Sequence, residues 1–326
     1  MTITAQSQDA FFSNILSQSI YDNPTFNSVK EIGQDETRGR ISLSYRDQWN
    51  RISQGTYSST LLEADYSFYQ SSLDNWNAGI YFLNDVSNSG VLKINGANLV
   101  SSYGRKLVDN RDNKATLFLG AGLGYNNTNI NTNGLWFGRQ YDQSIFEVNT
   151  ELANGEGNIT GDELSYISID FGLRLINQFR KVRTEFAIAA VHLNNPTIGD
   201  SNNPESIGTR INGFASISLL TNKTITHSFQ TRVISQLQSL QVVPTYVLDF
   251  SVHSDDNYKF KAGTGLRLVN NIDGIGTESL IVSVGLESKK WSGLISYDIN
   301  ISDLNFHTRG GGAFEIKLAY YIAQRQ

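Results

Sequence analysis

The stretch Ile167-Ser168-Ile169-Asp170-Phe171-Gly172-Leu173-Arg174-Leu175 decides the fold, because apolar and polar residues alternate strictly along it. Successive side chains of a β-strand point to opposite faces of the sheet, so a period of two predicts a strand with one apolar and one polar face. The segment from Phe314 to Ile322 repeats the pattern near the other end of the chain. Spacing typical of amphipathic helices is nearly absent. We therefore expect an all-β protein.

Segments of this type recur along the chain, and most contain about ten to fourteen residues. Strands of soluble domains usually contain about 5–6 residues, whereas a tilted strand that crosses a bilayer needs about 9–11. The predicted strands are 38–49, 57–69, 75–84, 91–104, 115–126, 164–176, 181–193, 207–220, 225–237, 241–252, 258–269, 279–288, 291–300 and 313–323. Their number and length predict a transmembrane outer-membrane β-barrel of about 14 antiparallel strands.

The connections between these strands alternate between short turns and longer loops, of which the longest are 127–163, 194–206 and 301–312. Outer-membrane barrels have short periplasmic turns and longer outer loops. We therefore expect a bacterial outer-membrane location with both termini in the periplasm. A soluble sandwich, propeller or jelly roll would also alternate, but strand length, loop asymmetry and aromatic residues near strand ends favour the membrane barrel.

Composition excludes several other classes of protein. The 326 residues carry a net charge of only −5 without a basic run, so we expect no nucleic-acid partner. The absence of Cys excludes disulfides and thiolate metal sites. No stretch approaches the 18 or so apolar residues of a spanning helix. The mean hydropathy of −0.29 fits a barrel, in which each apolar lipid-facing residue is averaged with a polar one.

Residues 1–37 precede the first predicted strand and do not alternate. The first few residues fit either the end of a signal peptide cleaved near Gln6 or a disordered terminus. Residues 6–37 are too apolar for a disordered tail, so they must pack on something. We expect this segment to plug the lumen, with docking under the periplasmic rim as the alternative. The chain then divides into residues 1–37, a signal-peptide remnant with a plug or rim segment, and the barrel 38–326.

The polar face of the predicted strands carries nearly balanced charge, which argues against an ion-selective pore. These residues either form charge pairs across the lumen or stand as separate solvated side chains. They are Arg40, Arg46, Arg174, Arg183, Arg210, Arg232, Lys261, Arg267 and Lys317 against Glu63, Asp65, Asp170, Glu185, Asp249, Glu287, Asp298 and Glu315. Gly120, Gly122 and Gly124 share one strand face, where they would let another segment approach closely.

No pattern of catalytic or ligand-binding residues emerges. The four histidines lack metal-site spacing, no nucleophile elbow is present, and the acidic stretch 151–163 does not match a calcium loop. We therefore expect no enzymatic activity, no cofactor and no metal. Pro244 falls inside a predicted strand, which indicates a bulge or a misplaced boundary because proline cannot donate to the ladder.

Five short motifs, in order along nearly the whole chain, resemble the PorP/SprF family of type IX secretion system membrane proteins of Bacteroidota. They are Asn23-Pro24, Tyr45-Arg46-Asp47-Gln48-Trp49, Phe137-Gly138-Arg139-Gln140, His192-Leu193-Asn194-Asn195-Pro196 and Gly311-Gly312-Ala313-Phe314-Glu315. The sequence departs from the family pattern at Phe314, where the family often has His, and this weakens any role for a His-Glu pair.

The resemblance implies a non-enzymatic outer-membrane component that supports export or surface anchoring of adhesins with a C-terminal sorting domain. Its implied partners are outer-membrane lipid, the adhesin, other secretion components and a periplasmic peptidoglycan-binding protein, and some relatives serve gliding motility. Candidate contacts for a protein partner are Trp136, Phe137, Gln140, Tyr141 and Phe146. Alternatively, these side chains fold the loop over the barrel mouth. The competing function is a pore or FadL-like transporter for small solutes.

Overall fold

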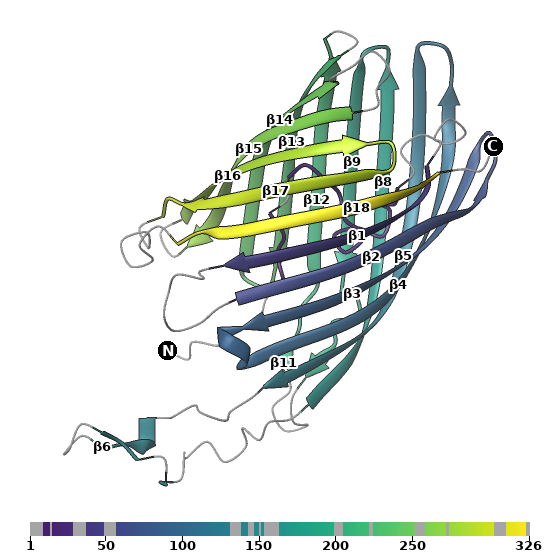
Figure 1. Ribbon diagram of the computed structural model, residues 1–326. Helices are drawn as coiled ribbons and strands as arrows, with labels where there is room; N and C mark the ends of the chain where they lie inside the picture. The colour runs from purple at the N-terminus through teal and green to yellow at the C-terminus, as the bar shows by residue number, and fades with distance from the viewer. Residues whose placement is uncertain are drawn as a thin grey trace.

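The computed structural model describes residues 9–13, 15–28, 37–48, 57–130, 138–142, 147–149, 151–152, 163–198, 205–221, 224–251, 258–271, 274–302 and 311–323. Fourteen strands form one closed antiparallel barrel (Figure 1). They are β1 (Thr37–Gln48), β2 (Tyr57–Gln70), β3 (Asp74–Ser87), β4 (Leu92–Asp109), β5 (Asn113–Ile130), β8 (Glu163–Phe179), β9 (Val182–Val191), β12 (Arg210–Leu220), β13 (Ile225–Gln236), β14 (Ser239–Ser251), β15 (Tyr258–Asn271), β16 (Gly274–Ser288), β17 (Trp291–Asn300) and β18 (Ala313–Ala323). The predicted fold class is confirmed.

Strand β8 shows why the sequence forms a barrel wall. Ile167, Ile169 and Phe171 are exposed on the outside, whereas the intervening Ser168 and Asp170 are buried on the inside. Neighbouring strands pair in sequence order, and β1 closes the sheet by pairing with β18. The apolar band thus faces outward around the barrel, as a bilayer requires.

Several strand limits differ from the predicted ones. β4 extends five residues beyond its predicted end and β5 is longer at both ends, so their connecting turn is only residues 110–112. Pro244 causes neither a bulge nor a break, because β14 is continuous and keeps its register with β13. The ladder with β15 instead lacks its pairings at Val243 and Pro244 and resumes in the same register at Thr245. The strand therefore tolerates the proline by losing local pairing on one side.

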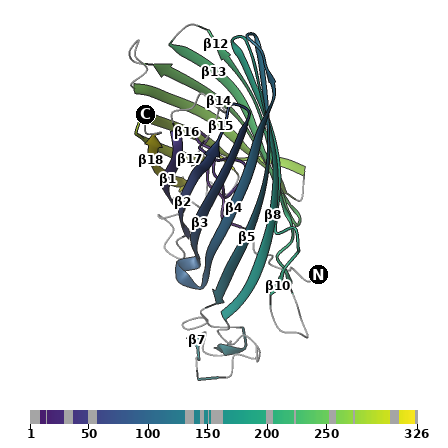
Figure 2. The ribbon, with the colours of Figure 1, turned by 90° about the vertical axis from the view of Figure 1, so that its right-hand side faces the viewer.

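The two ends of the barrel differ. The strand ends that border the connections 131–162, 192–209 and 301–312 lie at one end, here called the long-loop end, and the short turns 71–73, 110–112, 180–181 and 289–290 lie at the other, the short-turn end. In the side view β5 and β8 both reach the end of the barrel beyond which β7 lies (Figure 2). The small elements at the long-loop end are η1 (Asn88–Gly90), η2 (Gly138–Gln140), β6 (Tyr141–Asp142), β7 (Glu147–Val148), β10 (Thr197–Ile198) and β11 (Glu205–Ser206). No helix among the described residues is long and apolar enough to cross a membrane.

Residues 9–28, except for residue 14, lie inside the barrel, where Figure 1 shows them as a purple coil. We call them the inner segment. Asp9 contacts Gln236 at the long-loop end of β13, and the backbone N–H of Ser28 donates to Asp65 in the short-turn half of β2. The inner segment therefore runs along the lumen from one end toward the other. Asp9 consequently lies at the opposite end of the barrel from Ala323, which pairs with Thr37.

Candidate functional site: the inner segment and the lumenal wall

The Asn23-Pro24 motif holds the short-turn half of the inner segment against β5 and β8. The Asn23 side chain donates to the carbonyl oxygens of Leu173 (3.4 Å) and Ile188 (3.1 Å) and accepts from the backbone N–H of Thr25 (2.9 Å). A Cβ at Gly172 would lie 2.2 Å from Asn23 Oδ1. Glycine at position 172 therefore leaves room for the side chains of Asn23 and Pro24.

Gly120 on β5 serves the same close approach. A Cβ there would lie 2.9 Å from Thr25 and 3.0 Å from Pro24. The prediction that this glycine face admits another segment is therefore confirmed at Gly120, whereas Gly122 and Gly124 instead make room for wall side chains, those of Asp170 and Asn98.

A second group of contacts surrounds the middle of the inner segment. Glu63 accepts from the Ser19 hydroxyl (2.5 Å) and the Ile20 backbone N–H (2.9 Å), and it forms an ion pair with Lys317 (2.8 Å). Glu63 is fully buried. A buried carboxylate with this many donors is compensated, so it fixes the segment's position without leaving an unpaired charge.

A third group lies where β1 and β18 close the barrel. Asp298 accepts from Arg46 (3.0 Å) and Arg267 (2.6 Å), and both guanidinium groups also donate to the Ser13 hydroxyl. The Ser13 backbone N–H donates to Glu315 (2.7 Å). The inner segment is thus bonded into a buried cluster of two cations and two carboxylates.

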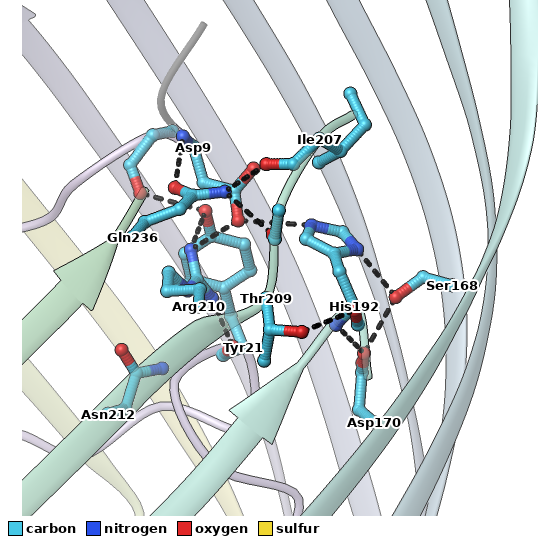
Figure 3. Close-up of polar contacts among 12 residues, drawn as sticks. Asp9, Tyr21, Ser168, Asp170, His192, Ile207, Thr209, Arg210, Asn212 and Gln236 are labelled. Atoms are coloured by element: carbon cyan, nitrogen blue, oxygen red, sulfur yellow. Dashed lines mark hydrogen bonds and ion pairs between the residues drawn. The ribbon is translucent and has the colours of Figure 1, made fainter. Parts of the chain in front are cut away.

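Asp9 fixes the start of the inner segment at the long-loop end (Figure 3). Its Oδ2 lies 3.0 Å from His192 Nε2 and 3.1 Å from Arg210 Nη1, and its backbone N–H donates to Gln236 (3.0 Å). Burial by itself would raise the pKa of the Asp9 carboxyl, but Arg210 and His192 outweigh it and hold that pKa at about 2. The carboxylate is therefore ionised at any physiological pH.

Arg210 also binds Tyr21 of the inner segment. Its two Nη atoms donate to the Tyr21 hydroxyl (2.6 Å) and carbonyl (3.0 Å), and its guanidinium stacks 4.3 Å from the ring centroid. Burial raises the pKa of the Tyr21 hydroxyl well above its usual value of 10. Arg210 thus ties two points of the inner segment to β12.

The contacts of His192 superficially resemble a hydrolase triad, since Nδ1 lies 2.7 Å from Ser168 Oγ and Nε2 lies near Asp9. However, Ser168 is fully buried and its hydroxyl already donates to Asp170 (2.7 Å). A nucleophile must reach its substrate, so this serine is not one. His192 instead has a positive φ of 57° and ends β9 as a structural corner.

Apolar side chains complete the packing. Phe12, Ile20 and Tyr21 pack with wall residues of β2, β3 and β4 in one cluster, and Ile15 and Leu16 pack with Val243 and other residues of β14, β16 and β17 in another. Inward-facing wall residues also form ion pairs with one another, which include Arg40–Asp65, Arg174–Glu185, Lys261–Glu287 and Lys317–Glu63. Of the two interpretations of the lumenal charges, cross-linking by pairs is therefore confirmed.

The residues predicted from the family motifs divide by location. Asn23 and Pro24 belong to the inner segment, and Arg46, His192 and Glu315 contact it. Gln48 accepts from Arg46 (3.3 Å), whereas Tyr45 faces outward. Pro196 and Gly312 make contacts through their backbones. The Pro196 carbonyl accepts from the backbone N–H of Ile207. A Cβ at Gly312 would collide with the carbonyl of Asp298. Trp49 lies outside the described residues.

Only part of the predicted interaction loop can be placed. Trp136, Phe137 and Phe146 lie outside the described residues, and Gly138 opens η2. Gln140 is buried and its side chain donates to the Leu152 carbonyl (3.0 Å), so it folds the loop on itself. Tyr141 is 37% exposed.

Sequence reasoning missed the partners that the inner segment supplies. Asp9, Ser13, Gln18 and Ser19 each bond to a charged wall residue, although nothing in their spacing distinguishes them. Their wall partners were predicted to face the lumen but could not be assigned contacts, because an irregular segment has no period from which its side-chain directions follow.

Comparison with known proteins agrees with this architecture. In solved structures the fold resembles the Ralstonia pickettii toluene transporter TbuX (11% identity, 94% of this chain and 93% of that chain, TM-score 0.55). It also resembles the CymD monoaromatic hydrocarbon channel (12% identity, 96% and 94%, TM-score 0.55). At these identities the likeness concerns the fold alone. No curated protein matches the sequence.

The comparison with family models identifies a family and not only a fold. The model of the family described as type IX secretion system membrane protein PorP/SprF matches residues 4–320, which is nearly the entire chain. The match includes the inner segment as well as the barrel, and with them every motif from Asn23-Pro24 to Glu315. The chain therefore belongs to the PorP/SprF family of type IX secretion system membrane proteins.

Proposed function

We propose that this protein is a non-enzymatic outer-membrane component of type IX secretion that supports export or surface anchoring of adhesins with a C-terminal sorting domain. Membership of the PorP/SprF family supports the assignment to the type IX secretion pathway. The observation that carries the mode of action is the occupied lumen, in which Ser13, Ser19 and Asp9 are bonded to buried ionised groups of the wall. Clearing the lumen would break many such contacts at once, which favours a scaffold over a conduit.

The ends of the barrel then have different partners. We propose that the long-loop end faces the cell surface, where Trp136, Phe137, Gln140, Tyr141 and Phe146 are candidate contacts for the adhesin. The short-turn end would face the periplasm, with the secretion components and a peptidoglycan-binding protein as partners. In this orientation Ala323 is on the periplasmic side, as expected for the C-terminus, whereas Asp9 is at the surface side.

Affinity purification from detergent-solubilised outer membrane tests this function. We expect the tagged protein to recover an adhesin sorting domain or a secretion component. Combined replacement of Trp136 and Tyr141 by Ala should reduce adhesin recovery, while a Tyr66→Ala control on the outward face of β2 should not. Recovery of neither partner class with the wild-type protein would contradict the proposal.

Transport of small apolar compounds is the second candidate function. One observation favours it: an outward-facing apolar groove of about 750 Å³, lined by Phe186, Ile217, Phe229 and Leu266, lies beside Pro244, where the β14–β15 ladder is interrupted. Stable, large single-channel conductance of the purified protein in a planar bilayer, or uptake of an aromatic hydrocarbon, would favour transport. We expect neither while the inner segment remains in place.

A further inference from the structure

The outward face of the barrel changes from apolar to polar at a sharp boundary on the wall formed by β2, β3, β4, β5 and β8, which lie side by side (Figure 2). One row of cross-strand partners on this wall is apolar and consists of Leu62, Phe82, Ala97, Tyr125 and Ile167. The next row toward the long-loop end consists of Thr60, Asn84, Asn95, Asn127 and Ser165. We call it the amide row. This wall therefore leaves the hydrocarbon of the bilayer between the two rows.

The amide row is a local feature of this wall. Elsewhere around the barrel, apolar outward side chains continue almost to the long-loop ends of the strands. Ile211 is the second residue of β12 and Ile299 is the second-last residue of β17, and both are exposed. A rim that served only hydration would be polar on these strands too. Asparagines in register on three neighbouring strands instead form a hydrogen-bonding surface at one place beside the headgroup layer.

A groove of about 410 Å³ crosses the boundary between the two rows. The small side chain of Ala97 forms its floor, between the larger side chains of its cross-strand partners Phe82 and Tyr125. Asn84 and Asn95 line the polar end of the groove. A molecule that fills it meets hydrocarbon at one end and amide groups at the other, so the groove fits an amphipathic ligand.

The hydrogen-bonding groups at the polar end match a sugar. Asn84 Nδ2 donates to Asn95 Oδ1 (2.7 Å), and both side chains are exposed. An asparagine amide carries two N–H donors and an acceptor oxygen, so this bond leaves the pair with further donors and a further acceptor. A sugar hydroxyl both donates and accepts. A phosphate only accepts and is usually bound by cations, whereas the amide row carries no charge.

We infer that this wall binds a glycolipid of the adjoining leaflet, with an acyl chain in the groove over Ala97 and the sugar headgroup on Asn84 and Asn95. Tyr125 suits both parts, because its ring flanks the groove and its hydroxyl reaches the amide row, where it donates to Ser165 (2.8 Å). The inference goes beyond the proposed function, since it gives the barrel a lipid ligand that is independent of any adhesin. Only the assignment of this leaflet to the cell surface rests on the proposed orientation.

Competitive lipid binding tests the inference. The full-length protein is purified in a polyoxyethylene detergent, which contains no sugar, and incubated with equal amounts of glucosyl-dioleoylglycerol and dioleoylphosphatidylglycerol. These two lipids have the same acyl chains and differ in the headgroup. Native mass spectrometry then counts the lipids that remain bound. We expect the wild-type protein to retain the glucosyl lipid about tenfold better, because the amide row makes hydrogen bonds to the sugar.

Two variants separate the headgroup contact from the acyl contact. The double substitution Asn84→Leu and Asn95→Leu should remove the preference for the glucosyl lipid. Ala97→Phe should fill the groove and reduce retention of both lipids. Ala121→Phe is its matched control, because Ala121 is also exposed on β5 but does not line the groove, and it should change neither retention nor preference. Retained heat-modifiability on gels shows that each variant is a folded barrel.

Three results would overturn the inference. The first is equal retention of the two lipids, or of neither, by the wild-type protein. The second is a preference for the glucosyl lipid that persists in the double asparagine variant. The third is a preference for phosphatidylglycerol that is lost in Lys93→Gln, because Lys93 is an exposed cation one row beyond Asn95, and this result would identify a phosphate site instead. None of these results depends on recovery of an adhesin, so the proposed function is tested separately.

Discussion

Arg46 and Glu315 are direct cross-strand partners where β1 meets β18, and Arg46 Nη1 lies 3.6 Å from Glu315 Oε2. This pair spans the seam that closes the barrel. Ser13 of the inner segment bonds to both residues, donating its backbone N–H to Glu315 and accepting from Arg46. Closure of the barrel and placement of the inner segment therefore depend on the same side chains.

Replacing Arg46 by Met should destabilise the barrel strongly. The substitution leaves Asp298 and Glu315 with one cation fewer in a buried site, and breaking a buried pair typically costs about 3–5 kcal/mol. Urea unfolding in lipid vesicles measures the change in free energy of unfolding. Arg105→Met is the control, because its exposed pair with Asp74 should contribute little to stability. Similar effects of the two substitutions would contradict the central role of the seam cluster.

Gly172→Ala should displace the inner segment, since the new Cβ would lie 2.2 Å from Asn23 Oδ1. Overpacking of this kind costs about 1–3 kcal/mol. The chain has no cysteine, so Ser28→Cys provides a single reporter thiol at a buried position. We expect faster thiol labelling in the Gly172→Ala background. Gly213→Ala is the control, because its Cβ would meet Val233 at an ordinary 3.6 Å, and it should leave the labelling rate unchanged.

Asp9→Asn should change the pH dependence of stability. Folding lowers the Asp9 pKa from its usual 3.8 to about 2, so its ionised contacts stabilise the protein fully above about pH 4, and this contribution is lost as the pH falls toward 2. At pH 7 the variant should be less stable by roughly 2 kcal/mol. Unfolding midpoints measured between pH 2 and 7 should converge at the acidic end. A difference that stays constant with pH would show that Asp9 acts through packing alone.

Phe229→Arg should be costly because Phe229 is 60% exposed on the outward face of β13. An arginine near the middle of the bilayer costs about 2–4 kcal/mol in a membrane barrel. Leu193→Arg is the control, since Leu193 is also exposed but lies beyond the end of β9. Equal tolerance of the two arginines in vesicle unfolding experiments would contradict the assignment of the outer face to lipid.

Alternation, together with strand length, loop asymmetry and aromatic residues near strand ends, was sufficient to predict the barrel, and each of the fourteen predicted segments overlaps one strand of the closed sheet. The same pattern predicted which charges face inward, such as Glu63 and Arg174. It could not predict their contacts. Glu63 pairs with Lys317 from a distant part of the sequence and with Ser19 of an irregular segment, and both contacts depend on how the sheet closes rather than on local periodicity.

The inner segment shows the same limit more sharply. Its apolar residues predicted that it packs in the lumen or at the rim, and family resemblance drew attention to Asn23 and Pro24. Its direction along the lumen depends on Asp9, whose partners Arg210 and Gln236 come from strands far along the sequence. A single aspartate before an apolar stretch carries no local signal of such a contact.

The inner segment's position also constrains biogenesis. It precedes β1 in the chain, and it is surrounded by a wall that β18, the last strand, completes. Drawing a segment with this many buried bonds into an already closed cylinder would be slow. Assembly of the sheet around the segment, which acts as a template, avoids this step. In that order Ser13 is already in place beside β1 when β18 pairs with β1 and brings Glu315 into contact with it.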